Sequence, residues 1–204
     1  MSNIGHDDGL AALSAPVDDE TVARLHDRLA RVAEAGGLLD VAYATVDSPV
    51  GALLLAATPR GLVRVAYTSE DHDRVLEELA EQLSPRILRA PARLDQTAHE
   101  LEDYFAGRRR AFDVPLDRSL SHGFRGLVQH RLSEIGYGET RSYRQVAELV
   151  DRPRAVRAVG TACATNPLPI VVPCHRVLRS DGGLGGYLGG PEAKAALLDL
   201  EAAA

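Results

Sequence analysis

A cysteine stands beside a histidine in the run Pro173-Cys-His-Arg176, and such a pair can perform nucleophilic chemistry. The thiolate is the reactive form of a cysteine, and neighbouring basic or cationic groups favour it. Cys174 is therefore a candidate nucleophile, and His175 is a candidate base. The chain has 2 cysteines, and a single cysteine can equally be a buried structural thiol. The neighbours of Cys174 favour the reactive alternative.

A carboxylate near the end of the chain could complete this group. Residues 191–202 predict a helix on which Leu197, Leu198 and Glu201 share one face, because residues three and four apart are neighbours on a helix. A carboxylate that points inward needs a partner, and His175 is the natural one. Cysteine, histidine and glutamate would then act as nucleophile, base and orienting group. The alternative is a solvated Glu201 close to a frayed terminus.

The segment before the cysteine predicts how the pair is presented. Residues 168–172 read as a strand, Pro173 follows it, and a glycine-rich loop occupies 182–190. Adjacent residues on a strand point to opposite faces. His175 would therefore reach Cys174 only through a turn or a bridging water.

Charge along the chain is uneven. The net charge of −6 argues against a nucleic-acid partner for the protein as a whole. Within 141–179, however, the acidic side chains are Glu148 and Asp151 alone. The basic ones there are Arg141, Arg144, Arg152, Arg154, Arg157, Arg176 and Arg179. This stretch predicts a local phosphate-binding surface, unless the arginines merely reflect a chain whose one lysine is Lys194.

A pair of short helices lies in the same stretch. Ser142 is a good N-cap for a helix over 143–150, and a second helix is predicted over about 153–164. Two short helices joined by a tight turn are typical of a helix-turn-helix, although two packed structural helices are the alternative. The second helix is lined by small residues and carries one long cation, Arg157, which favours a narrow minor groove over base reading in the major groove.

The remaining elements follow from periodicity. Residues 1–17 are expected to be flexible, and 18–36 predict a helix packed through Val22, Leu25, Leu29 and Val32. Strands are predicted at 40–46, 52–57 and 62–67, and helices at 70–83, at about 93–106 and at 122–135. In the last of these, the residues expected to face inward are Phe124, Leu127, Val128, Leu132 and Ile135. Residues 107–121 form a connector.

These elements predict an α/β (α+β) protein with a three-stranded antiparallel sheet in its first half and a mostly helical second half. The expected boundaries are an extension with one helix over 1–37, an α/β domain over 38–117 and a helical domain over 118–204.

The hydrophobic content of 45% and the charged content of 25% are those of a globular protein. No apolar run could span a bilayer and no leader is recognised, so we expect a cytoplasmic protein. No metal or cofactor is expected, because the histidines and cysteines lack ligand spacing.

Several ordered blocks make the chain resemble the O6-alkylguanine-DNA alkyltransferases, or methylated-DNA–protein-cysteine methyltransferases. In order along the chain, the blocks are Gly138-Glu-Thr-Arg-Ser-Tyr143, Ala155-Val-Arg-Ala-Val-Gly160, Asn166-Pro-Leu-Pro-Ile-Val-Val-Pro-Cys-His-Arg-Val177 and Gly185-Gly-Tyr-Leu-Gly-Gly190. The resemblance is dense over about 122–201. It is weaker over about 40–117, through Val46-Asp-Ser-Pro-Val-Gly51 and Tyr104-Phe-Ala-Gly107, and it does not reach 1–37.

The resemblance implies a ribonuclease H-like first domain and direct repair of double-stranded DNA. O6-alkylguanine, with O4-alkylthymine as an alternative, would be flipped out and would lose its alkyl group irreversibly to Cys174. The implied catalytic residues are Cys174, His175 acting through a water, Glu201 orienting it, and Tyr187 donating a hydrogen bond to the departing guanine. The implied DNA contacts are Tyr143, Arg144, Arg152, Arg157 and Ser180. The implied hinge and pocket residues are Asn166, Cys163, Pro169 and Leu188.

Departures from the family pattern concern packing and pocket shape. Gln129 stands where the family usually has tryptophan, Gly136 replaces a common proline, and Leu188 stands where other members have serine. The family implies a monomer with no membrane partner and leaves cooperative binding along DNA open. A helix-turn-helix damage sensor and a Cys-His hydrolase are the competing functions.

Overall fold

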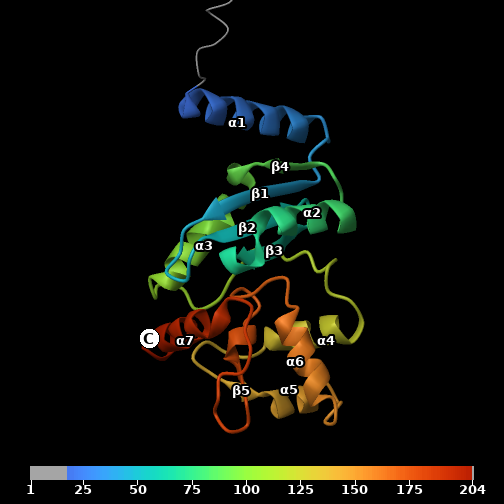
Figure 1. Ribbon diagram of the computed structural model, residues 1–204, viewed down its shortest axis with the longest axis vertical. Coiled ribbons are helices and arrows are strands. Elements are labelled where there is room, and N and C mark those ends of the chain that lie inside the picture. The colour runs from blue at the N-terminus through green and yellow to red at the C-terminus, as the bar shows by residue number, and fades with distance from the viewer. Residues whose placement is uncertain (1–17, 204) are drawn as a thin grey trace, which may run out of the picture.

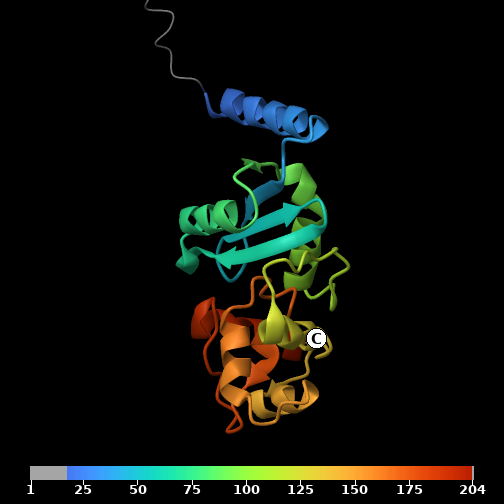
Figure 2. The ribbon, with the colours of Figure 1, turned by 90° about the vertical axis from the view of Figure 1, so that its right-hand side faces the viewer.

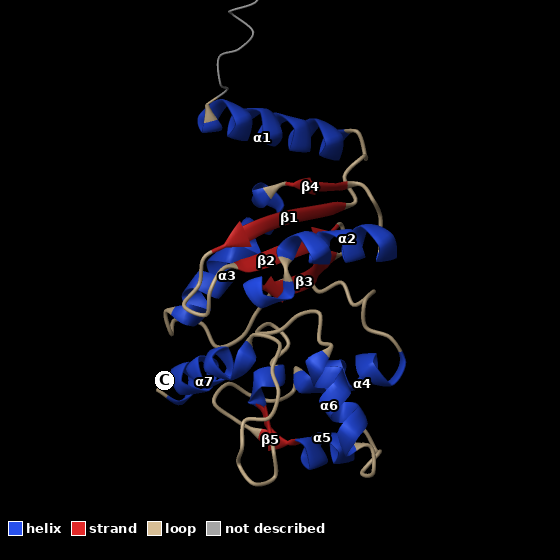
Figure 3. Cartoon of the chain, viewed as in Figure 1, coloured by secondary structure: helices blue, strands red, loops and turns tan. Residues whose placement is uncertain are grey.

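The computed structural model describes residues 18–203, so the flexible segment predicted for 1–17 lies outside them. The described elements run from α1 beside the sheet to α7 near the C-terminus (Figures 1 and 3). The strands are β1 (Val41–Val46), β2 (Leu53–Thr58), β3 (Gly61–Tyr67), β4 (Ile87–Arg89), β5 (Arg141–Ser142) and β6 (Val177–Leu178). The α-helices are α1 (Asp19–Ala35), α2 (His72–Gln82), α3 (Asp95–Phe105), α4 (Gly123–Leu132), α5 (Tyr143–Leu149), α6 (Val156–Ala164) and α7 (Gly190–Ala202).

The sheet of the N-terminal region contains the predicted meander and one further strand. β1 pairs antiparallel with β2, and β2 with β3, which confirms the predicted meander. The three-stranded prediction omits β4, which pairs parallel with β1 and gives the order β3-β2-β1-β4. With only three residues, β4 is too short to show a period in the sequence.

Helix α1 forms where it is predicted, but it does not pack through the predicted face. It crosses the β4 edge of the sheet (Figures 1 and 2). Ala30 and Ala33 are the buried residues of this helix, since small side chains allow close approach to the sheet. The residues expected to pack, Val22, Leu25, Leu29 and Val32, are 37% to 63% exposed. That expectation is therefore wrong.

The C-terminal region is mostly helical, with small differences from the predicted elements. Helix α6 begins at Val156 instead of 153, because Asp151 has a φ of 54° and residues 151–155 form turns. Helix α4 ends at Leu132, and its Leu127 is 44% exposed instead of facing inward. The two-residue strands β5 and β6 pair in parallel and were not predicted.

The strand predicted for 168–172 does not form. Pro167 and Pro169 cannot donate to a ladder, and the buried Ile170 has a φ of 73°, which is costly for a β-branched residue. The backbone instead turns tightly, with the Val172 amide donating to the Leu168 carbonyl at 2.8 Å. A short 3₁₀ helix over Cys174–Arg176 follows and presents the predicted reactive residues.

One hydrophobic cluster joins the two regions. It contains Leu53 and Tyr104 from the N-terminal region together with Val128, Val159 and Cys174 from the C-terminal region. The cysteine therefore lies in the core where both regions pack. Among residues 18–203, no helix has the length and apolar character needed to cross a membrane.

Candidate active site

Cys174 is buried, and its environment does not favour the thiolate in the free protein. The residue is 2% exposed, and Asn166 Nδ2 donates to its Sγ at 3.1 Å. Burial raises the pKa of the Cys174 thiol to about 11, although the Asn166 hydrogen bond and the charge of Lys194 oppose this rise. The expectation that its neighbours ionise Cys174 is therefore wrong for the free protein, which holds a protonated thiol at neutral pH.

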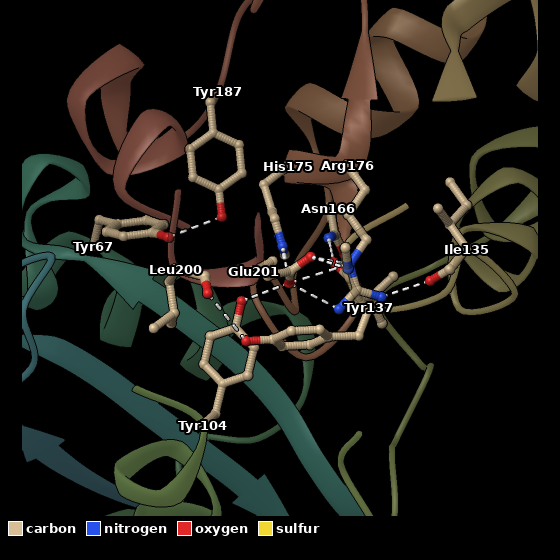
Figure 4. Close-up of polar contacts among 12 residues, drawn as sticks. Tyr67, Tyr104, Ile135, Tyr137, Asn166, His175, Arg176, Tyr187, Leu200 and Glu201 are labelled. Carbon is tan, nitrogen blue, oxygen red and sulfur yellow. Dashed lines mark hydrogen bonds and ion pairs between the residues drawn. The ribbon is translucent and has the colours of Figure 1, made fainter. Parts of the chain in front are cut away.

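His175 and Glu201 are brought together by the 3₁₀ helix and α7. His175 Nε2 lies 2.8 Å from Glu201 Oε1, and the His175 side chain is fully buried (Figure 4). Burial lowers the pKa of His175 below its usual value despite the nearby carboxylate, so the imidazole is neutral at pH 7. Nε2 then carries the proton donated to Glu201. Nδ1 is buried, and it has no hydrogen-bond partner within the described part of the chain.

Glu201 is surrounded by donors. Arg176 donates through Nε to Oε2 at 2.9 Å and through Nη2 to Oε1 at 2.8 Å. The Tyr104 hydroxyl donates to Oε1 at 2.7 Å, and the Gly138 amide to Oε2 at 3.1 Å. Burial opposes ionisation of this carboxyl, but the hydrogen bonds from His175 and Arg176 outweigh it and hold the pKa of Glu201 at about 2. The carboxylate is ionised throughout the neutral range.

Arg176 acts on the carboxylate instead of the sulfur. Besides its hydrogen bonds to Glu201, it donates through Nη1 to the Ile135 carbonyl at 2.5 Å, and its guanidinium lies 5.8 Å from the centre of the Tyr137 ring. The cation that lowers the pKa of Cys174 is Lys194, which sequence reasoning missed. Its helical spacing of three and seven residues from Leu197 and Glu201 places it on the inward face of α7, and that pattern could have revealed it.

Lys194 connects two backbone segments around the thiol. Its Nζ donates to the carbonyl of Val177 at 2.6 Å and also to the carbonyl of Leu184. The side chain is fully buried, and burial lowers the pKa of Lys194. The residue therefore ties the glycine-rich loop to the segment that carries Cys174.

Tyr187 projects from the glycine-rich loop beside the catalytic histidine candidate. Its ring contacts the His175 ring edge to face at 6.3 Å, and its hydroxyl lies 2.9 Å from the hydroxyl of Tyr67 (Figure 4). Burial raises the pKa of Tyr187 well above its usual value, so the phenol keeps its proton. Tyr67 and Tyr104 come from the N-terminal region. The sequence places Tyr67 at the end of a predicted strand and Tyr104 in a predicted helix, and no local signal marks their contacts with the site.

The predicted hinge and pocket residues line the loop around Cys174. Asn166 is buried, and it also donates to the Val172 carbonyl at 2.8 Å and accepts from the Leu168 amide at 3.1 Å. Burial, together with nearby Cys174, raises the pKa of Cys163. Pro169 is buried in the turn. Leu188 is half-buried and lines a cavity of about 490 Å³ between the two regions.

The predicted DNA contacts divide into exposed and half-buried residues. Arg144, Arg152, Arg157 and Ser180 are exposed. Arg144 and Ser180 line an open groove of about 610 Å³ that Arg141 and Arg179 also border. Tyr143 is half-buried, and a methyl group on Gly185 would come within 2.8 Å of the Tyr143 hydroxyl. Tyr143 thus lies against the glycine-rich loop.

Gln129 shows how one departure from the family pattern is accommodated. Its Nε2 donates to the carbonyls of Ala162 and Thr165 at 2.9 and 3.2 Å. These bonds satisfy carbonyl groups at the C-terminal end of α6, which carries Arg157. The described residues contain no group of three or more histidine, cysteine or acidic side chains placed to hold a metal ion.

Comparison with known proteins covers both regions. The family model described as 6-O-methylguanine DNA methyltransferase, ribonuclease-like domain, matches residues 41–118. The model described as 6-O-methylguanine DNA methyltransferase, DNA binding domain, matches residues 123–203.

Individual relatives match along most of their length. The methylated-DNA–protein-cysteine methyltransferase of Methanosarcina barkeri is 39% identical over 159 residues, which cover 78% of this chain and 96% of that protein. The Mycobacterium tuberculosis protein of the same name is 41% identical over 159 residues, which cover 78% of this chain and 91% of that protein.

Solved structures give the same result. The Mycobacterium tuberculosis O6-methylguanine methyltransferase matches with a TM-score of 0.70 and 38% identity, covering 80% of this chain and 93% of that one. The OGT of that organism in complex with DNA matches with a TM-score of 0.67 and 39% identity, covering 79% of this chain and 93% of that one. With models matched over both regions and relatives close to 40% identical, the chain belongs to the 6-O-methylguanine DNA methyltransferase family.

Proposed function

We propose that this protein repairs double-stranded DNA by moving the alkyl group of O6-alkylguanine to Sγ of Cys174, once per chain. The observation that carries this proposal is the buried thiol next to His175, whose Nε2 is bound to an ionised Glu201. This arrangement leaves Nδ1 to accept a proton. O4-alkylthymine, which carries its alkyl group on a comparable oxygen, is a second substrate to test.

The proposed step balances without a cofactor. The bond between O6 and the alkyl carbon breaks while a bond from Sγ of Cys174 to that carbon forms. The thiol proton passes to His175 Nδ1 through a water, and Glu201 stabilises the resulting imidazolium. The guanine leaves as an anion that a hydrogen bond from Tyr187 stabilises, and the proton finally reaches the base. The product is a thioether with no good leaving group, so the chain reacts once.

The pKa values explain why transfer waits for substrate. A thiol with a pKa of about 11 next to a neutral imidazole stays protonated in the free protein. A bound alkylguanine offers an electrophilic carbon, and the proton can then move as the sulfur attacks. The ionised Glu201 favours this movement, because it stabilises positive charge on His175.

We propose that DNA lies across α5, α6 and the glycine-rich loop. Arg157 is exposed on a helix of small residues, so it can enter the minor groove and fill the place of the flipped base. Tyr143 would press on the phosphate that rotates during flipping. Arg144, Arg152 and Ser180 would contact the backbone, with Arg144 and Ser180 in the open groove.

The pocket would be formed by residues around the thiol. Asn166 supports the turn before Cys174 through its bonds to Val172 and Leu168. Cys163, Pro169 and Leu188 would form walls, and Cys163 would not act as a second nucleophile.

We further propose boundaries of 38–117 and 118–204 for the two domains, with 1–37 as an extension, a division that the spans of the two family models support. The protein would act as a monomer. A reactive free thiol suits the reducing cytoplasm, where we place the reaction.

Mass analysis after incubation with duplex DNA containing O6-methylguanine tests the central proposal. We expect the Cys174 peptide to gain one methylene, with no more than one transfer per chain and no label on the Cys163 peptide. Cys174→Ala should abolish transfer and keep DNA binding. DNA binding without any mass change would indicate a damage sensor, and repeated turnover of an ester would indicate a hydrolase; either result contradicts the proposal.

Arg157→Ala tests base flipping separately. Because an extrahelical base costs a few kcal/mol of unstacking, the variant should lose more activity on duplex DNA than on a free O6-alkylguanine base. Arg28→Ala, an exposed arginine on α1, is the matched control. Equal loss on both substrates would reject the flipping role of Arg157.

A further inference from the structure

We propose that Tyr67, a residue of the N-terminal region, is a positioning residue for the departing guanine. Its hydroxyl would donate to the oxygen of Tyr187 and so direct the Tyr187 proton toward the base. This inference rests on the proposed function, in which Tyr187 is the donor to the leaving group. Through Tyr67, the N-terminal sheet would contribute to the hydrogen bonds that stabilise the leaving group.

The contact between the two tyrosines is close, and it joins the buried Tyr67 to the half-buried Tyr187. Tyr67 ends β3 and is 3% exposed. The two hydroxyl oxygens lie 2.9 Å apart, and the rings meet edge to face with centres 5.7 Å apart and planes at 70°. Figure 4 shows the two side chains with their hydroxyl groups directed toward each other.

Proton counting gives this contact a direction. Each phenol has one proton, and the pair shares one hydrogen bond. If Tyr187 donates to Tyr67, its proton is no longer available to a substrate. If Tyr67 donates, the Tyr187 proton is free to point at the base. A base that develops negative charge favours the second arrangement, and a chain of two donors strengthens each hydrogen bond.

The structure holds Tyr67 in place for this contact. Its backbone amide donates to Glu70 Oε1 at 2.9 Å, and Glu70 forms an ion pair with Arg64. The ring also supports the loop that carries Tyr187. A methyl group added at Gly189 would lie 2.6 Å from the Tyr67 ring, so the backbone at Gly189 rests directly against it. Tyr67 therefore supports the loop at Gly189 and contacts the hydroxyl of its Tyr187.

Tyr67→Phe keeps the ring and removes the hydroxyl, so it tests the hydrogen bond alone. The probes are free O6-benzylguanine and O6-benzyl-8-bromoguanine, whose purine is the better leaving group. We expect single-turnover labelling of Cys174 to slow about tenfold with the first probe, the typical effect of one hydrogen bond, and distinctly less with the second. Tyr43→Phe, a half-buried tyrosine on β1, is the matched control and should leave both rates unchanged.

A double variant provides a second criterion. In Tyr67→Phe/Tyr187→Phe, loss of the Tyr67 hydroxyl should have no further effect, because its only proposed action is through Tyr187. Equal slowing with both probes, or independent effects of the two substitutions, would overturn the inference and reduce Tyr67 to a packing residue. Thermal unfolding midpoints of each variant would show that the chains are folded.

The outcome is separable from that of the proposed function. If the unaltered protein does not label Cys174 with O6-benzylguanine or with methylated duplex DNA, the proposed function fails. If it labels Cys174 and Tyr67→Phe labels it as quickly, only the inference about Tyr67 fails.

Discussion

On the sulfur side of the site, Glu201 accepts hydrogen bonds from His175, Arg176, Tyr104 and the Gly138 amide, all in the protein without substrate. On the side proposed for the leaving group, here called the leaving-group side, Tyr187 projects from a glycine-rich loop, and its hydroxyl contacts that of Tyr67. One side is fixed by charged groups from several elements, whereas the other is a loop that Lys194 holds at Leu184 and that rests on the Tyr67 ring at Gly189.

The difference follows from what each side would have to do. Groups that move a thiol proton would need the same geometry for every substrate, and preorganised donors avoid reorganisation during the reaction. The leaving-group side must admit a flipped base with alkyl groups of different size. A loop with few side chains can adjust to them, at the cost of depending on a neighbouring region for its position.

Glu201→Gln should have the largest effect and should break the sulfur side. It leaves Arg176 buried without its charge partner, so we expect the free energy of unfolding to fall by about 3–5 kcal/mol. Transfer should slow by about 10²- to 10⁴-fold, and by the same factor for every leaving group. Denaturant unfolding and single-turnover labelling measure the two effects. Asp199→Asn, an exposed acid on α7, is the control; a dependence on leaving group would contradict the division between the two sides.

Lys194→Met should affect both sides at once. The variant leaves the Val177 and Leu184 carbonyls without their donor, so the unfolding free energy should fall by about 1–3 kcal/mol. Loss of the cation should also raise the pKa of Cys174 further. Measuring the alkylation rate of the Cys174 thiol as a function of pH would detect this rise. An unchanged pKa would show that Lys194 acts on the loop alone.

Gly189→Ala should disturb only the leaving-group side. The added methyl group would overlap the Tyr67 ring, and because the loop can shift, we expect a cost of about 1 kcal/mol. Labelling should slow more for bulky alkyl groups than for methyl. At Gly186 an added methyl group meets no atom within 4 Å, so Gly186→Ala should have the smaller effect. Slower labelling in Gly186→Ala than in Gly189→Ala would exclude contact with Tyr67 as the cause.

The smallest change at neutral pH is expected from the titration of Glu201. Its pKa of about 2 in the folded state is below the usual value of 4.5. Its contribution to stability is therefore complete above pH 4.5 and is lost as pH falls toward 2. Urea unfolding at several pH values should show this loss, and Glu201→Gln should remove it. Identical acid profiles for the two proteins would contradict the pairing of Glu201 with His175 and Arg176.

The sequence predicts the elements with clear periodicity and the residues of the reactive run. Alternation reveals β1, short apolar runs bounded by turns reveal β2 and β3, and helical spacing reveals that Glu201 faces inward. The three-residue β4 has no measurable period, and the turn around Ile170 depends on a left-handed backbone that its β-branched side chain disfavours.

Other features depend on tertiary contacts that no local pattern encodes. The pKa of Cys174 could not be anticipated from its neighbours in sequence, because Arg176 turns to Glu201 and burial dominates. Tyr67 and Tyr104 reach the site only because the sheet and α3 pack against the C-terminal region. The exposed face of α1 likewise could not be told from a packed one by spacing alone.

Burial of Cys174 also affects how long the protein stays usable. Oxidants and stray alkylating agents attack thiols that are ionised and accessible. A thiol that is 2% exposed and has a pKa of about 11 resists such attack. If each chain can react only once, its one reactive thiol would then be consumed by a damaged base and not by peroxide. The burial that raises the pKa of the thiol would therefore also prolong the time for which the protein can still react in the cell.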